Sequence, residues 1–87
     1  MKSSNYLLEC CVDSAYSARM AKKGGADRLE LCSNLVIGGT TPTLALYEQI
    51  RNQTDIRIHV LIRPRFGDFL YSEDETALIC KEIDAFR

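Results

Sequence analysis

The 87-residue chain lacks several features that define whole classes of protein. It contains no tryptophan and a single histidine, and no apolar run approaches the roughly 18 residues that a membrane-spanning helix needs. Its formal net charge is −1, so no strong field of either sign attracts nucleic acid or an acidic membrane surface. The first residues carry no apolar signal-peptide core. These absences predict a cytoplasmic protein whose partners include neither nucleic acid nor a membrane.

The spacing of the four cysteines lacks the signatures of common cysteine sites. There is no C-x-x-C pair and no cysteine–histidine spacing typical of zinc. Disulfides belong to secreted proteins, and nothing in the sequence indicates secretion, so reduced thiols are expected. Cys10 and Cys80 fall on apolar faces of predicted elements and are expected in the core, which leaves Cys11 and Cys32 as candidates for chemistry.

Three strand–helix units are predicted by the hydrophobic pattern. Apolar and polar residues alternate in three short segments, which is typical of strands. The expected strands are residues 6–12, 27–32 and 57–63. A helical pattern follows each strand, and the helices are expected to begin at caps on Asp13, Thr41 and Ser72. The last of these belongs to an S-x-x-E capping box in which Ser72 pairs with Glu75. Units of roughly 25 to 30 residues imply parallel strands joined by helical crossovers.

Each predicted strand has one apolar and one polar face, and this contrast selects the architecture. The polar faces carry Glu9 and Cys11, then Arg28, Glu30 and Cys32, then His59, Leu61 and Arg63. A doubly wound sheet would bury this face under helices, at a cost of several kcal/mol for each unpaired charge. In a β/α barrel every helix lies outside, and the polar faces meet in the lumen.

The alternation therefore favours an α/β fold with a parallel βαβαβα order, the first three units of a TIM-type (β/α)8 barrel. Such a barrel needs about 250 residues. Residues 1–87 are accordingly expected to form a partial β/α barrel, either as a single domain or as the N-terminal fragment of a longer protein.

Several stretches together resemble one known family, the CutC copper-homeostasis proteins. They are LECCVDS (8–14), GGADRLELCSNLVIGGTTPT (24–43) and VLIRPRFGDFLYS (60–72). The resemblance runs along nearly the whole chain, which departs from the family by ending early and by having Cys10 and Phe66 where other residues are common. It implies the N-terminal third of a cytosolic, often oligomeric barrel that takes part in copper homeostasis. It also implies Cu(I) as the ligand, with Cys11 and Cys32 matching the family's proposed copper-binding cysteines.

The predicted strands support a thiolate site at these two positions. Cys11 and Cys32 would end neighbouring parallel strands, which lie about 4.8 Å apart, on the same inward face. Two soft thiolates suit Cu(I) better than zinc, which takes four ligands. The alternative is that both cysteines are small buried side chains without chemistry.

A second set of residues follows the third strand, where barrels keep their active sites. In the segment RPRFGDF, Arg63 and Arg65 are candidates for binding an anion such as a carboxylate or phosphate. Asp68 could belong to the same site or simply brace one of the two arginines.

Carboxylates on the inner face make an enzyme the alternative function. Glu9 or Glu30, with His59 nearby, are candidates for the general base of a barrel enzyme acting on a small anionic metabolite. The competing interpretation is a paired polar layer that fills the lumen. A third hypothesis is a piece without activity that only self-associates.

Overall fold

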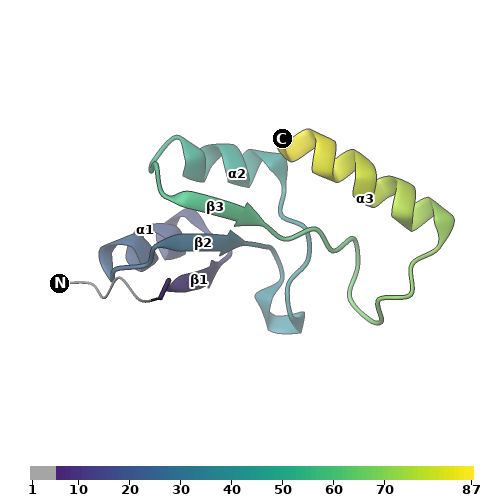
Figure 1. Ribbon diagram of the computed structural model, residues 1–87, viewed down its shortest axis with the longest axis horizontal. Helices are drawn as coiled ribbons and strands as arrows, with labels where there is room; N and C mark the ends of the chain where they lie inside the picture. The colour runs from purple at the N-terminus through teal and green to yellow at the C-terminus, as the bar shows by residue number, and fades with distance from the viewer. Residues whose placement is uncertain (1–5) are drawn as a thin grey trace.

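Strand and helix alternate three times along the chain, as the hydrophobic pattern predicts (Figure 1). The computed structural model describes residues 6–87. In chain order the elements are β1 (Glu9–Val12), α1 (Ala15–Lys23), β2 (Arg28–Leu31), the 3₁₀ turn η1 (Leu35–Ile37), α2 (Leu44–Arg51), β3 (Arg57–Val60) and α3 (Glu73–Phe86). The three strands form one parallel sheet in the order β1-β2-β3, so the predicted βαβαβα order is confirmed.

Two helices begin later than predicted. The N-cap of α1 is Ser14 rather than Asp13, and the N-cap of α2 is Thr43 rather than Thr41. Each wrong prediction chose the first of two nearby residues able to cap a helix. The Thr41 hydroxyl instead accepts a hydrogen bond from the backbone N–H of Arg63 at 2.8 Å, so it joins the loop to the end of β3.

The start of α3 follows its prediction more closely than the starts of α1 and α2. The capping box between Ser72 and Glu75 forms with both of its reciprocal hydrogen bonds.

Each observed strand has four residues and is therefore shorter than its prediction. The ladder continues one step past β3, where the Leu61 amide donates to the Leu31 carbonyl oxygen at 2.9 Å.

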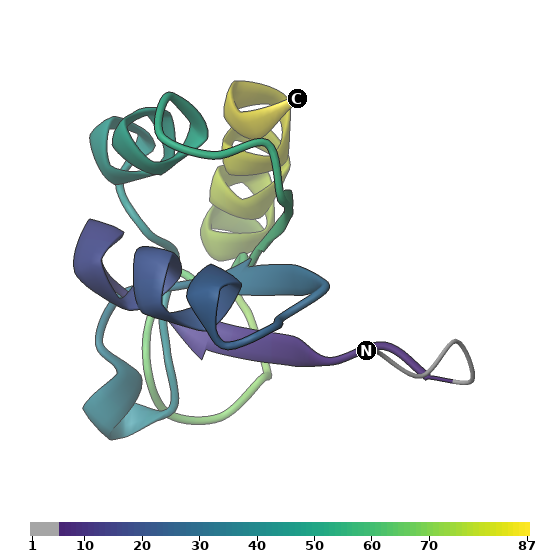
Figure 2. The ribbon, with the colours of Figure 1, turned by 90° about the vertical axis from the view of Figure 1, so that its left-hand side faces the viewer.

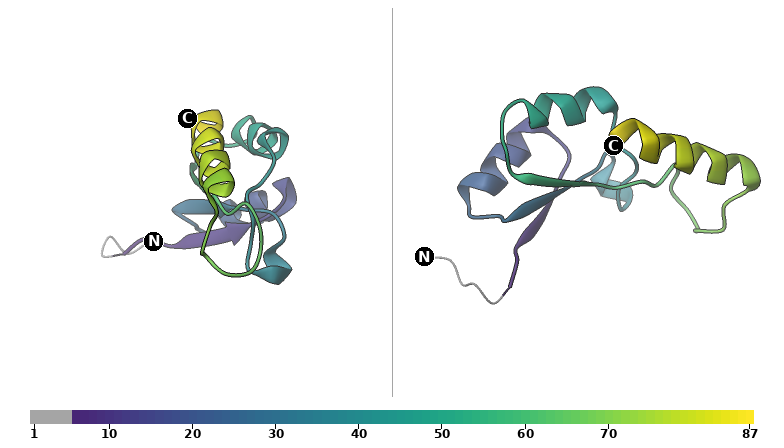
Figure 3. Two further views of the ribbon diagram at one scale, coloured as in Figure 1. Left: turned by 90° about the vertical axis from the view of Figure 1, so that its right-hand side faces the viewer. Right: turned by 45° about the horizontal axis from the view of Figure 1, so that its top comes forward.

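The hydrophobic core lies between the sheet and the first two helices. Leu29 and Leu31 of β2 are completely buried, and they pack with Ala18 of α1 and Ile50 of α2. The small Ala18 lets α1 approach the sheet closely. Figure 2 and the right-hand view of Figure 3 show α1 and α2 on the same side of the sheet.

Within residues 6–87, no α-helix covers the opposite face of the sheet. The parallel register places polar side chains next to each other on this uncovered face. Glu9 lies beside Arg28, and Cys11, Glu30 and His59 form a row across the three strands. This separation of helices from polar side chains is the feature that distinguished a barrel from a doubly wound sheet.

The third helix extends beyond the carboxyl ends of the strands (Figure 1). Its last turn contacts α2, where Phe86 and Tyr47 meet edge to face with their ring centroids 5.6 Å apart. No residue of α3 is buried in the described chain, and Cys80 is exposed. The prediction of a core position for Cys80 was wrong, because an apolar stripe is buried only where another element packs against it. None of the helices in residues 6–87 is long and apolar enough to span a bilayer.

Candidate functional site

Cys11 lies on β1 and Cys32 directly follows β2, and the two cysteines are not directly opposite one another. The register between β1 and β2 pairs Cys11 with Glu30, and Cys32 comes two residues later. An offset of two residues is about 6.6 Å along a strand, and neighbouring strands are about 4.8 Å apart, so the two Cα atoms are separated by roughly 8 Å. The cysteines therefore form a diagonal pair at the carboxyl ends of the strands.

The two thiols differ in exposure and in their hydrogen bonds. Cys11 is exposed, and its thiol donates to Glu30 Oε1 at 3.4 Å. Cys32 is only 1% exposed, and its thiol donates to the Val12 carbonyl oxygen at 3.7 Å. One thiol therefore faces solvent directly, and the other lies behind a covering layer of protein.

The surroundings of both cysteines favour the protonated thiol. The hydrogen bond to Glu30, together with partial burial and nearby negative charge, raises the pKa of Cys11. Burial, followed by the charges of Cys11 and Glu30, raises the pKa of Cys32 to about 11. A metal that binds to these sulfurs must displace their protons, so the affinity of the site depends on pH.

The donor set fits a metal that accepts two soft ligands. Across residues 6–87, no group of three or more histidine, cysteine, aspartate or glutamate side chains is arranged to hold a metal ion. With metal–sulfur distances of about 2.3 Å, two sulfurs on opposite sides of an ion would be about 4.6 Å apart. To reach this separation, the Cys11 and Cys32 side chains would have to turn from their present acceptors, Glu30 and the Val12 carbonyl oxygen, toward each other across the diagonal. Soft two-sulfur ligation suits Cu(I) and excludes a four-ligand zinc site from these residues alone.

Both carboxylates predicted on the polar face, Glu9 and Glu30, accept hydrogen bonds from neighbouring side chains. Glu9 Oε2 accepts from Arg28 Nε at 2.7 Å and lies 3.6 Å from His59 Nδ1. Glu30 accepts the hydrogen bond from Cys11. The structure thus brings Glu9 together with Arg28 and His59 in a polar layer, and it joins Glu30 to the thiol site instead.

Arg63 reaches back over the loop that follows β2. Its guanidinium Nη1 donates to the carbonyl oxygens of Gly39 at 2.9 Å and Ile37 at 3.3 Å. Nη2 donates to the carbonyl oxygen of Gly67 at 3.2 Å, and the ring of Phe69 lies 5.3 Å from the guanidinium carbon. Arg63 therefore connects three segments at the carboxyl ends of the strands.

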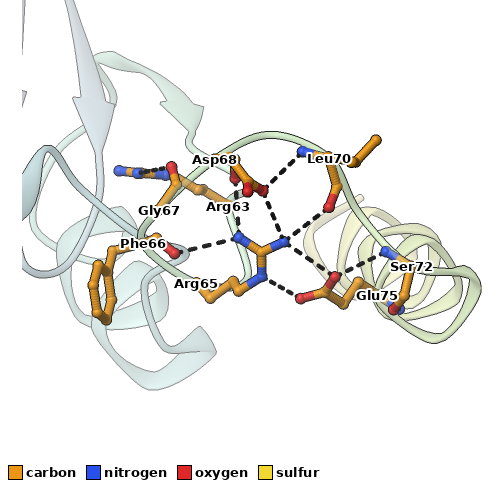
Figure 4. A network of polar contacts seen from close by, with 8 residues as sticks. All are labelled: Arg63, Arg65, Phe66, Gly67, Asp68, Leu70, Ser72 and Glu75. Carbon is orange, nitrogen blue, oxygen red and sulfur yellow. Dashed lines mark hydrogen bonds and ion pairs between the residues drawn. The ribbon is translucent and has the colours of Figure 1, made fainter.

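Arg65, two residues later, is held by carboxylates (Figure 4). Its guanidinium makes a two-pronged ion pair with Glu75, and Nη2 lies 3.3 Å from Asp68 Oδ1. It also donates to the carbonyl oxygens of Asp68 and Leu70, both at 3.0 Å. This arrangement braces the segment between β3 and α3, and it leaves Arg65 less available for an external anion than Arg63.

Two partners in this region were absent from the sequence analysis. Glu75 was recognised only as half of a capping box, although the pattern of Arg65 followed by an acidic first helical turn contains the signal for an ion pair. Gly39 has φ +95° and lies against Cys32. This contact with Cys32 depends on the path of the loop between β2 and α2, which carries Gly39.

The comparisons with known proteins agree with this arrangement. The model of the CutC family matches residues 6–87. A copper homeostasis protein cutC homolog from Homo sapiens is 47% identical over 81 residues, and a family protein CutC from Porphyromonas gingivalis is 48% identical over 80 residues. The crystal structure of a CutC protein from Streptococcus agalactiae superposes with a TM-score of 0.77 at 31% identity and covers 92% of this chain.

The matched region is one part of longer proteins. It spans 92–93% of this chain but 30% of the human relative, 32% of the relative from P. gingivalis and 40% of the chain in the streptococcal structure. The match confirms the predicted fold class, a parallel α/β arrangement of three consecutive β/α units. On this combined sequence and structural agreement, the chain belongs to the CutC family.

Proposed function

We propose that this chain binds Cu(I) as part of a cytoplasmic copper-homeostasis protein, with Cys11 and Cys32 as the ligands. Relatives from human and mouse carry copper homeostasis in their names. The single observation that carries the ligand assignment is the diagonal placement of an exposed thiol on β1 and a buried thiol directly after the neighbouring strand β2. Copper is the cargo in this proposal, and no turnover is required.

The chemistry of binding follows from the positions of the two thiols. Cys11 is the entry ligand because it is exposed, and Glu30 is the nearest acceptor for the proton that Cys11 releases. Cys32 then becomes the second ligand when its thiol turns from the Val12 carbonyl oxygen toward the ion and loses its proton to solvent. Each sulfur is a soft donor, which favours Cu(I) over harder divalent ions.

An anaerobic competition titration against a chromophoric Cu(I) chelator tests the proposal. We expect one Cu(I) per chain in the unmodified protein and loss of that site in Cys11→Ala and in Cys32→Ala. Cys80→Ala is the matched control, because Cys80 is exposed but lies on α3, away from the polar face. Unchanged stoichiometry in both ligand variants, or an equal loss in the control, would overturn the assignment.

A barrel enzyme acting on a small anion is the second candidate, and Arg63 is the observation that favours it. Among the described residues, no carboxylate forms an ion pair with its guanidinium, whereas Arg65 has two such partners. Glu9 and Glu30 are the proton-transfer candidates of this hypothesis. Nη1 and Nη2 of Arg63 already donate to backbone carbonyls, and Nε is buried and has no hydrogen-bond partner among the described residues. An anion must compete with those carbonyls for the guanidinium, which places this function second. A phosphate titration followed by NMR of the Arg63 side chain distinguishes the two candidates.

Self-association is the remaining part of the proposal. We expect further copies of this chain as partners, because the β3 edge and large apolar side chains such as Val36 and Phe69 are exposed within residues 6–87. Sedimentation velocity across a hundredfold concentration range checks this expectation. A concentration-independent monomer would contradict it.

A further inference from the structure

The short loop between β2 and α2, residues 33–40, covers the thiol of Cys32. Two backbone hydrogen bonds between Ser33 and Thr40, at 2.9 and 2.7 Å, close its base. Inside the loop, Gly39 lies against the buried cysteine, since a Cβ built on Gly39 would be 3.5 Å from Cys32 Sγ. No α-helix covers this side of the sheet in the described chain, so the loop supplies a large part of the cover over Cys32.

Arg63 ties this loop to the end of the third strand. Two of its hydrogen bonds end on loop carbonyls, those of Ile37 and Gly39, and a third ends on Gly67 of the following segment. The close approach depends on glycine, because a Cβ on Gly38 would lie 3.2 Å from Arg63 Nη1. The guanidinium is suited to this task because its planar fork donates in several directions at once.

We propose that Arg63 is a positioning residue of the thiol site, which latches the 33–40 loop over Cys32 and sets how readily this thiol is reached. The loop opens locally when Arg63 releases its carbonyls, without unfolding of the sheet beneath it. The connection to copper rests on the proposed function, but the latch itself is tested without metal.

The charge distribution explains why such a latch can open. The acceptors of Arg63 are neutral carbonyl oxygens, whereas Arg65 is held by the carboxylates of Glu75 and Asp68. Hydrogen bonds that join a charged donor to a neutral acceptor can be exchanged for hydrogen bonds to water more readily than a two-pronged ion pair. The brace around Arg65 therefore stays in place while the loop over Cys32 moves.

Thiol labelling of the metal-free chain tests the latch. The protein is treated with N-ethylmaleimide, and the modification of each cysteine is followed by peptide mass spectrometry. In Arg63→Gln we expect Cys32 to react at least 10-fold faster, with the exposed Cys80 unchanged. The matched control is Arg65→Gln, which removes a neighbouring guanidinium without touching the loop and leaves the Cys32 rate within twofold. Equal Cys32 rates in the unmodified chain and in Arg63→Gln would overturn the proposal.

A second measurement needs no substitution and covers the case in which Arg63→Gln fails to fold. Local opening exposes little new surface, so the labelling rate of Cys32 should be nearly independent of urea at low concentration. Global unfolding, followed in parallel by far-UV circular dichroism, should instead depend steeply on urea. If the labelling rate of Cys32 shows the same steep dependence on urea as global unfolding, the latch does not exist.

Failure of the latch and failure of the copper proposal are separable. If both hold, Arg63→Gln keeps one Cu(I) per chain and takes up the metal at least 10-fold faster in stopped-flow mixing. A chain that shows the labelling effect but binds no Cu(I) would remove the copper proposal and keep the latch. If the chain binds Cu(I) but Cys32 is labelled at the same rate in Arg63→Gln and in the unmodified chain, the latch is removed and the copper proposal stays.

Discussion

Replacing Gly39 with alanine should destabilise the protein strongly, because two separate penalties meet at this position. The backbone at Gly39 has φ +95°, a conformation that costs an alanine about 1–3 kcal/mol. The added Cβ would also lie 2.9 Å from Leu61 Cδ2, and overpacking of this kind costs about 1–3 kcal/mol. The expected loss is about 2–6 kcal/mol, against roughly 4–13 kcal/mol of total stability for a chain of this length.

Gly25 provides a matched control for the backbone penalty. Its φ is +102°, and a Cβ placed there would meet no heavy atom within 4 Å. Gly25→Ala should therefore lose only about 1–3 kcal/mol. The difference between the two variants isolates the contact with Leu61, and in a Leu61→Ala background Gly39→Ala should cost no more than Gly25→Ala.

Urea denaturation followed by far-UV circular dichroism measures these free energies by linear extrapolation. The reasoning is refuted if Gly39→Ala and Gly25→Ala lose the same stability, or if Leu61→Ala fails to relieve the Gly39→Ala penalty. Because Gly39 lies against Cys32, the same variant should also raise the N-ethylmaleimide reactivity of Cys32 under native conditions.

Three further predictions concern the thiols and the start of α3. The apparent Cu(I) affinity should rise about 100-fold per pH unit between pH 6 and 8, because the raised pKa values of Cys11 and Cys32 require two protons to leave; a flat profile in the competition titration would contradict this. Ser72→Ala should lower the free energy of unfolding by about 0.5–2 kcal/mol in urea denaturation, since it removes one half of the capping box, and an unchanged midpoint would show that the cap is not needed. The Arg65 guanidinium lowers the pKa of Glu75 to about 2, so Glu75 stabilises the fold above its ordinary value of 4.5 and this contribution is lost as the pH falls toward 2. In a carboxyl ¹³C NMR titration, the pH midpoint of Glu75 should move up toward 4.5 in Arg65→Gln. A Glu75 midpoint already near 4.5 in the unmodified chain would refute the ion pair with Arg65.

Local signals were sufficient for the order of elements and for one helix start. The period-two alternation around Glu30 identified the polar face, and the Ser72–Glu75 spacing identified the capping box. At the other two helices, residues able to cap stand one or two positions apart. The choice of Ser14 over Asp13 depends on backbone geometry that a short pattern does not contain.

Features set by register and by long-range contacts were beyond the sequence pattern. Alternation predicts that Cys11 and Cys32 share a face, but only the pairing of Cys11 with Glu30 makes them diagonal. The exposure of Cys80 depends on how little of α3 meets another element in residues 6–87. The cover over Cys32 depends on the path of the loop that carries Gly39, which no local pattern encodes.

The central claim is that Cys11 and Cys32, on the uncovered face of the sheet, hold one Cu(I) ion. X-ray absorption spectroscopy at the copper edge, on the anaerobic one-to-one complex, tests this claim most directly. The account predicts a Cu(I) ion with two sulfur neighbours and no nitrogen or oxygen ligand, and loss of this spectrum in Cys11→Ala and Cys32→Ala. A spectrum that contains nitrogen or oxygen ligands, or one that is unchanged in either variant, would contradict it.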